Sequence, residues 1–233
     1  MIFETKGITR KYFYDIAFLI KAISTDETRY FMHYINVETK KNKDDEEMVY
    51  CVTTDGRIMH IVEYKKEDSP LENGFYSVSQ NKKDIILLNK SDESVNFPNW
   101  SKIVEQMDNH LKVIENFELR QENGFTKLVF ILNNLGYHIK FNYLQSIIDL
   151  CSSPSRLLHD TCDIYLNSYR QGDGVKFING NCTAIIMPMN IKEIIPVIYN
   201  AYTKLDNSLK ELNKTEVLFE HSILRKKKYL WEE

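Results

Sequence analysis

The histidines, cysteines and glycines of this chain are the residues whose spacing could signal catalysis or metal binding. None of the six histidines is paired with an acid or a cysteine at a spacing that would set up a base and a nucleophile. The four cysteines include no C-x-x-C pair and have no histidine at zinc-site spacing beside them. Phosphate-binding and hydrolase signatures such as the P-loop, G-x-G-x-x-G, G-x-S-x-G and H-E-x-x-H are absent. The sequence therefore predicts a non-enzymatic protein without metal or cofactor, and leaves as the alternative an enzyme whose catalytic residues converge from distant strands.

Composition and charge narrow the class of protein further. The chain has 233 residues, of which 43% are hydrophobic and 12% aromatic, enough to bury a core. Its net charge of -3 excludes a global basic field, so nucleic acid would have to be bound by a local basic face. No signal peptide and no apolar run of about 20 residues is present. With reduced cysteines, these features predict a soluble cytoplasmic protein.

The most specific local signal is the stretch Val52–His60, in which Asp55 and Gly56 separate two β-branched runs. Tight hairpin turns need positive φ, which glycine adopts readily, so the stretch predicts a hairpin between strands over residues 48–54 and 58–64. A distant counterpart, Ala184–Met189, ends in Met-Pro-Met. The functional interpretation depends on whether these two stretches meet in space, and we expect that they do.

The elements that would position these stretches occur twice in one order, a helix followed by three strands. In the first repeat, apolar residues at helical spacing over 9–23 follow Thr9 as N-cap, and strands are expected at 28–39, 48–54 and 58–64. In the second, Asn142 begins a short helix, and strands are expected at 162–168, 174–178 and 182–189.

The segment between the two repeats is less regular. Short strands are expected at 74–79 and 84–90, and a helix at 101–114. Asn123 and Gly124 form a second hairpin signal, which predicts strands at 117–121 and 126–132, and a further strand is expected at 136–141.

A tail follows Asn190. Six of its apolar residues alternate spacings of three and four, which is typical of a helix with one apolar seam: Ile195, Ile198, Tyr202, Leu205, Leu209 and Leu212. Pro196 places the start of this helix near Glu193. The helix either lies on its own sheet or mediates self-association. The basic cluster Arg225–Lys228 either contacts phosphates or an anionic membrane surface, or is simply an exposed end.

Four sets of short stretches carry a resemblance to a known family. They are Ser24–Tyr30, Thr53–Arg57, Phe97–Trp100, and Lys140–Leu144 with Met187–Met189. Ser24–Tyr30 is similar to the segment after the first helix of a clamp domain, and Thr53–Arg57 to the family's Thr-Asp-Gly turn. Phe97–Trp100 is similar to the Phe-Pro-aromatic element between clamp domains. Lys140–Leu144 and Met187–Met189 are similar to the start of the last helix and to the C-terminal strand. Together, over residues 8–190, they resemble the bacterial DNA polymerase sliding clamp, the β-subunit processivity factor. The repeat of a helix and three strands is that family's building unit.

The resemblance implies an α+β fold of DNA-clamp units, each a helix with antiparallel strands. It implies a first clamp-like unit with extra strands over 1–96, and a linker helix and second unit over 97–190. The helical tail over 191–233 is predicted from its apolar spacing and is an added C-terminal helix without a counterpart in the family. The chain is shorter than the bacterial subunit. Where the family's turn continues with Arg and then Leu, this chain has Ile58 and Met59.

The resemblance also implies two binding sites. In the family, the turn and the Met-Pro-Met strand line a hydrophobic pocket for short peptides from polymerases and other replication proteins. The matching positions here are Thr54, Gly56, Arg57, Ile58, Met59, Ile186, Met187, Pro188 and Met189. The alternative is that these are ordinary core-strand residues. The DNA-facing positions are Arg10, Lys11, Tyr14, Lys21 and Arg29. Asp15 on the first helix, and Asp149 with the polar Asn142, Gln145 and Ser146 on the second, predict an inner face that is only weakly positive.

Two functions follow as hypotheses. The first is a clamp-like replication accessory of phage or mobile-element origin. It would be a homo-oligomer that binds peptides of DNA polymerase or other replication proteins and associates with double-stranded DNA. The second is a clamp-fold interaction or decoy module that self-associates through its tail helix and does not encircle DNA. Neither involves a membrane.

Overall fold

Antiparallel strands dominate the computed structural model, which describes residues 2–4, 10–82, 85–92, 95–119, 124–148, 161–166 and 173–189. The chain divides into two units, Met1–Met189 and Asn190–Glu233. All described residues belong to the first unit. The tail helix expected from Glu193 onward and the basic cluster Arg225–Lys228 lie outside the described residues.

The strands of the first unit are β1 (Ile2–Glu4), β2 (Tyr34–Lys41), β3 (Glu47–Thr54), β4 (Ile58–Lys65), β5 (Gly74–Lys82), β6 (Ile85–Ser91), β7 (Leu111–Glu118), β8 (Thr161–Leu166), β9 (Val175–Asn179) and β10 (Cys182–Ile186). The helices are α1 (Arg10–Ile20), α2 (Trp100–Gln106), α3 (Gly124–Asn134) and α4 (Phe141–Ile148), with 3-10 turns η1 (Glu27–Met32), η2 (Lys66–Asp68) and η3 (Met107–Asn109). The α+β class predicted from the sequence is confirmed.

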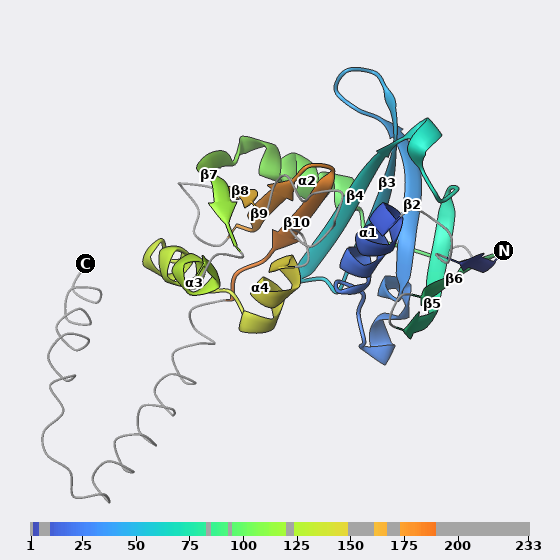
Figure 1. Cartoon of the computed structure of the whole chain (residues 1–233), viewed down its shortest axis with the longest axis horizontal. Helices are drawn as coiled ribbons and strands as arrows, with labels where there is room; N and C mark the ends of the chain where they lie inside the picture. Colours follow the sequence, from blue (N-terminus) through green and yellow to red (C-terminus); the bar gives the residue numbers. More distant parts are fainter. Residues whose placement is uncertain are drawn as a thin grey trace, which may run out of the picture. The chain divides into compact units, whose positions relative to one another are not determined.

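The ten strands form one sheet in the order β1-β6-β5-β2-β3-β4-β10-β9-β8-β7 (Figure 1). The strands of the first repeat meet those of the second where β4 pairs with β10. Their register runs from Ile58 opposite Ile186 to Val62 opposite Cys182. This single antiparallel pairing joins the two halves of the sheet.

The two faces of the sheet are covered by different helices. Figure 1 shows α1 and α4 on one face of the sheet and α2 on the other. Side chains of a strand alternate between faces, so on β4 His60 and Val62 pack on the side of α1 and α4, whereas Met59 and Ile61 pack on the side of α2. Two separate apolar clusters result, a large one under α1 and α4 and a smaller one under α2.

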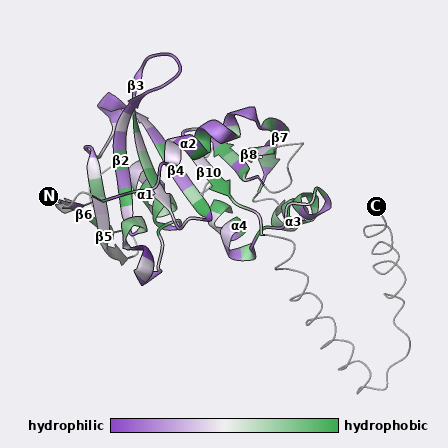
Figure 2. Ribbon diagram, turned by 180° about the vertical axis from the view of Figure 1, so that it is seen from behind, coloured by the Kyte–Doolittle hydropathy of each residue, from purple (hydrophilic) through white to green (hydrophobic). Residues whose placement is uncertain are grey.

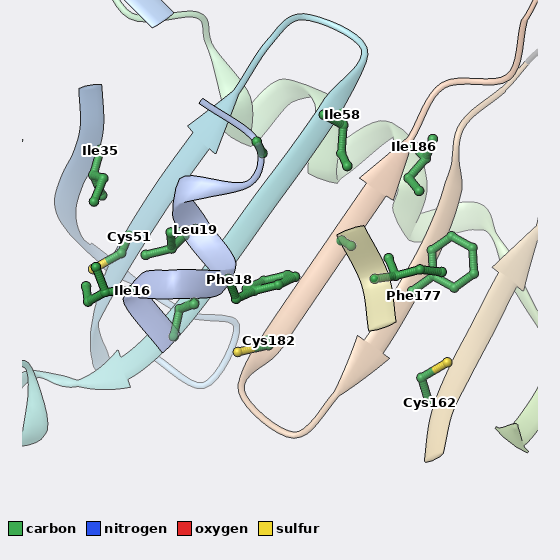
Figure 3. Close-up of a cluster of buried hydrophobic side chains, with 14 of the residues drawn as sticks. Ile16, Phe18, Leu19, Ile35, Cys51, Ile58, Cys162, Phe177, Cys182 and Ile186 are labelled. Carbon is green, nitrogen blue, oxygen red and sulfur yellow. The ribbon is translucent and has the colours of Figure 1, made fainter. Parts of the chain in front are cut away.

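The large cluster extends across both halves of the sheet. Phe18 and Leu19 of α1 are fully buried against the strands, as is Phe177 of β9 in the second half (Figure 3). Burying such a side chain contributes about 1.5–3 kcal/mol relative to leaving it exposed. By contrast, the tip of the β2–β3 hairpin is hydrophilic and projects away from the sheet (Figure 2).

A carboxylate, Asp15, lies fully buried in the large cluster. The hydroxyl of Tyr64 donates a hydrogen bond of 2.9 Å to Asp15 Oδ2, and Cys182 Sγ lies 4.0 Å from Asp15 Oδ1. Burial, reinforced by this carboxylate, raises the pKa of Tyr64 and of the Cys51 thiol. Asp15 therefore ties α1 to β4 and β10 instead of facing solvent.

Most strand predictions are confirmed, and the larger errors fall between the repeats. The helix expected over 101–114 ends at Gln106, and β7 begins at Leu111. Residues 126–132, expected as a strand, lie in α3, because Leu128 and Leu132 are buried one helical turn apart. Gly124 begins that helix, and glycine suits this position because a Cβ there would collide with the carbonyl oxygen of Glu118.

Two further expectations were wrong at their ends. Residues 28–32, expected as strand, belong to η1, whose N-cap is Asp26. The expected strand over 136–141 does not form, and Phe141, not Asn142, begins α4. None of the helices in the described part of the chain is long and apolar enough to cross a membrane.

We expect Tyr64→Phe to lower the free energy of unfolding by about 1–3 kcal/mol, because the substitution removes a donor from a buried carboxylate. Urea denaturation followed by circular dichroism measures this change. Tyr165→Phe removes the same hydroxyl from a half-buried tyrosine of β8 and is the matched control. Equal changes in the two variants would contradict the role of Asp15.

Candidate functional site

The Asp55–Arg57 turn is closed by its own side chains. Asp55 Oδ1 accepts hydrogen bonds from the backbone N–H groups of Arg57 and Ile58, both at 2.8 Å. Thr54 Oγ1 donates to the carbonyl of Ile58 at 2.8 Å and accepts from the N–H of Gly56 at 2.9 Å. Gly56 has a φ of +88°, as the Asp-Gly signal predicts. The hairpin is confirmed, with Asp55, Gly56 and Arg57 between the strands.

The turn and the Met-Pro-Met stretch lie side by side. Ile185 and Ile186 of β10 are opposite Met59 and Ile58 of β4. Beyond the strand, the N–H of Met187 donates a 2.8 Å hydrogen bond to the carbonyl of Arg57. The two stretches that the sequence singled out therefore meet in space.

The residues expected to line a peptide pocket separate into two groups. Thr54, Ile58, Met59 and Ile186 are buried in the protein core. Gly56, Arg57 and Met187 are exposed, and Pro188 and Met189 are half-buried. Only the second group lies at the surface.

Met59 is buried because α2 and η3 cover the face of the sheet to which it points. Met59 and Ile185 belong to the same apolar cluster as Trp100 and Met107. A Cβ on Gly174 would lie 2.6 Å from Met107 Cε and 3.1 Å from Met187 Sδ, so these two methionines approach each other over a glycine. The exposed Met187 thus lies at the edge of the apolar cluster that α2 and η3 cover.

A cavity of about 710 Å³ opens on the other side of the turn, on the face that α1 and α4 cover. It is formed by the segment after α1, by η1, by the turn and by the start of α4. Its charged lining residues are Lys21, Asp26, Arg29, Asp55 and Arg57, and α4 contributes Asn142, Tyr143, Gln145 and Ser146. The cavity is therefore polar and has one more cation than anion.

Arg29 fixes one wall of this cavity to the turn. Its Nη1 donates a 2.8 Å hydrogen bond to the carbonyl of Asp55, and its Nε lies 3.5 Å from Asp26 Oδ2. Hydrogen bonds from Thr28, with a smaller contribution from Arg29, lower the pKa of Asp26. A Cβ on Gly56 would lie 3.0 Å from Arg29 Nη1, so the guanidinium passes close over the turn.

His60 is buried next to the cavity and contacts Ser146, one of the residues that line it. Its ring stacks on Phe18 with centroids 3.9 Å apart, and Nδ1 lies 2.6 Å from the carbonyl oxygen of Phe18. Its Nε2 lies 3.3 Å from Ser146 Oγ on α4. Complete burial lowers the pKa of His60 to about 4. A neutral ring donates from Nδ1 to the carbonyl of Phe18, and the Ser146 hydroxyl beside Nε2 donates to the carbonyl of Tyr143 at 2.7 Å, so these contacts link α1, β4 and α4.

The expected DNA-facing residues are only partly brought together. Lys21 and Arg29 are exposed and line the cavity, and Tyr14 is half-buried on α1. Arg10 and Lys11 begin α1, but their side chains lie outside the described residues, as does Asp149. Asp15 faces the core, so it does not reduce the positive charge of the surface as the sequence suggested.

Sequence reasoning missed His60, Tyr143 and Ser146 as a connected group. Their contacts join β4 to α4, and no local spacing signals such a contact. The described residues contain no group of three or more His, Cys, Asp or Glu residues that could hold a metal ion. Cys51, Cys162 and Cys182 are buried, and none of these three forms a disulfide within the described residues.

Comparison with solved structures gives the fold a known counterpart. The structure of Caulobacter crescentus pol III β matches with a TM-score of 0.50 and 15% identity, over 82% of this chain and 65% of that one. The chain has the fold of a sliding clamp. This chain thus spans less than two thirds of that sliding clamp's length.

Other solved sliding clamps are similar at lower scores. The Bartonella birtlesii sliding clamp bound to griselimycin has a TM-score of 0.48 and 13% identity, over 81% of this chain and 66% of that one. The Pseudomonas aeruginosa sliding clamp has a TM-score of 0.47 and 10% identity, over 82% and 66%. No protein-family model and no curated protein sequence matches the chain.

We expect the free energy of unfolding to decrease as the pH is lowered, because of His60. Its folded-state pKa of about 4 lies below the ordinary 6.5, so between these values the unfolded chain binds a proton that the folded chain excludes. The stabilisation is fully present above pH 6.5 and is lost as the pH falls. About 2 kcal/mol should be lost between pH 7.5 and pH 5.

Urea denaturation of wild type and His60→Gln at several pH values measures this contribution. The variant should lose less stability than wild type over the same pH interval. Parallel curves for the two proteins would show that His60 is not the titrating group.

Proposed function

We propose that this protein is a non-enzymatic, sliding-clamp-like accessory of DNA replication that binds short peptides and associates with double-stranded DNA. The observation that supports this most directly is the contact between the Asp55–Arg57 turn and Met187. It brings the two stretches that resemble the clamp's peptide pocket to adjacent positions. The clamp fold gives those stretches the same scaffold.

The peptide site would use the exposed part of the expected set. Met187, Pro188 and Met189 offer an apolar strip, and methionine side chains adapt to varied partners. Gly56 and Arg57 stand beside this strip, so a backbone edge and a guanidinium are available to orient a peptide. Thr54, Ile58, Met59 and Ile186 would support the strip from within the core instead of touching the peptide.

The DNA-facing surface would be the side covered by α1 and α4. Lys21 and Arg29 are exposed there. Tyr14 lies on α1, and Lys21 directly follows the end of that helix. Such cations neutralise phosphates and release counterions, which makes binding strongly dependent on salt. Encirclement of DNA further requires a closed homo-oligomer. A local basic surface of this kind is compatible with the overall net charge of -3.

A second candidate function keeps the fold and the peptide strip but omits DNA. Asp26 and Asp55 stand among the cations of the cavity, which weakens its attraction for phosphate. In this case the protein is an interaction or decoy module that self-associates through the helix expected from Glu193 onward.

We expect Met187→Ala to weaken the binding of a labelled clamp-binding polymerase peptide about tenfold, because the thioether supplies apolar contact at the strip. Fluorescence anisotropy titration measures the dissociation constant. Leu111→Ala truncates a side chain of similar size that is exposed on β7 and serves as the matched control. Equal binding by all three proteins, or no binding by wild type, would remove the peptide site.

We expect the double variant Lys21→Gln, Arg29→Gln to bind a short duplex less tightly than wild type. Its plot of log affinity against log salt should be shallower by about 2, because two phosphate contacts are lost. Anisotropy of a labelled duplex at several salt concentrations measures both quantities. Lys41→Gln with Lys66→Gln removes the same charge near the β2–β3 hairpin and should leave the slope unchanged.

Light scattering on the same samples measures the molar mass and so reports whether the protein forms a multimer with a defined number of copies. A monomer that binds no duplex at low salt would favour the interaction module. Equal losses of affinity in the two double variants would instead indicate a general charge effect.

A further inference from the structure

The polar cavity beside the Asp55–Arg57 turn is larger than a contact with one phosphate requires. Its volume of about 710 Å³ lies within the range of about 300–1,000 Å³ that is usual for small-molecule sites. Four separate segments wall it, from the end of α1, η1, the turn and α4. The cavity is therefore concave, although open to solvent, whereas a duplex backbone needs only a flat basic face.

The cations of the cavity are not equally engaged. Arg29 is held by the carbonyl of Asp55 and the carboxylate of Asp26. Arg57 is exposed, and its guanidinium makes no hydrogen bond or ion pair with any residue in the described ranges. An exposed arginine at the rim of a cavity can bind the oxygen atoms of a phosphate through two parallel N–H groups. Arg57 is therefore the anion-binding residue that the cavity offers.

The two acids of the cavity are occupied by donors. Asp55 Oδ1 accepts two backbone N–H groups of the turn. Asp26 accepts hydrogen bonds from the N–H and the hydroxyl of Thr28, both through Oδ1. These bonds offset part of the negative charge that would repel a phosphate. The cations are thus left with a net excess over the anions.

The α4 wall offers groups that fit a base. Tyr143 is half-buried, and burial together with the nearby Asp55 raises the pKa of its phenol. Its aromatic ring lines the cavity, where a base can stack on it. Asn142 and Gln145 are exposed amides on the same wall, and amides can hydrogen bond to base edges.

We propose that this cavity binds a nucleoside monophosphate, with the phosphate on Arg57 and Lys21 and the base against Tyr143, Asn142 and Gln145. The proposal goes beyond peptide docking and duplex association, and it shares Lys21 with the proposed DNA-facing surface and Arg57 with the proposed peptide site. The ligand is a free nucleotide or one nucleotide of a single strand, because both carry the same phosphate and base.

Isothermal titration of the full chain with AMP, adenosine, inorganic phosphate, a short single strand and a duplex tests the proposal. AMP should bind at least about tenfold more tightly than phosphate or adenosine alone, because it engages both ends of the site. If the single strand competes with AMP, the ligand of the cavity is a nucleotide within a single strand. If AMP binds and the single strand does not, the ligand is a free mononucleotide. Phosphate binding as tightly as AMP would overturn the proposal and leave a simple anion site.

Two variants locate the ligand. Arg57→Gln should weaken AMP binding about tenfold through the loss of charge-assisted hydrogen bonds. Tyr143→Leu should reduce the preference for AMP over phosphate severalfold through the loss of stacking. Lys66→Gln and Tyr165→Leu make comparable changes away from the cavity and should bind AMP as wild type does. Circular dichroism establishes that each variant is folded.

The outcomes separate this proposal from the proposed function. Duplex binding without any AMP binding would overturn the nucleotide site and leave the DNA-facing surface intact. AMP binding without duplex binding would support the nucleotide site and remove the DNA-facing surface. Equal loss of AMP affinity in the cavity variants and the distant controls would overturn the nucleotide site, because binding would not depend on the cavity.

Discussion

The antiparallel pairing of β4 with β10 is the interaction on which the rest of this structure depends. It joins two sets of strands into one sheet, and it places α4, the helix of the second repeat, beside α1, the helix of the first. The pairing is extended by one further hydrogen bond, from Met187 to the carbonyl of Arg57. Without that register, the apolar strip at Met187 and the polar cavity at Arg57 would not share one turn.

Local signals in the sequence predicted the elements of each repeat well. The Asp-Gly turn, its flanking strands and the first helix follow from turn chemistry and from apolar periodicity, which are properties of neighbouring residues. The segment around Gly124 was misread, because a short apolar run such as Leu128–Leu132 has no periodicity that separates a strand from a buried helix. Long-range packing of Leu128 and Leu132 decided between them.

The sequence alone does not show which distant residues meet, so the candidate sites were predictable only through the resemblance to a known family. That resemblance predicted that the turn and Met187–Met189 lie together, and the strand register confirmed their contact. Burial could not be read in the same way, so Met59 was expected at a surface that α2 in fact covers. Asp15 is the opposite case, because a charged residue on an amphipathic helix is usually solvated, whereas here Tyr64 holds it inside.

The close passage of Arg29 over Gly56 has a consequence for how this protein can vary. At a φ of +88°, which L side chains rarely adopt, any side chain at position 56 would strain the turn. With Arg29 Nη1 3.0 Å from where a Cβ would stand, such a side chain would also displace the guanidinium that donates to the carbonyl of Asp55. Natural variants of the chain should therefore keep glycine at position 56 even where position 29 changes.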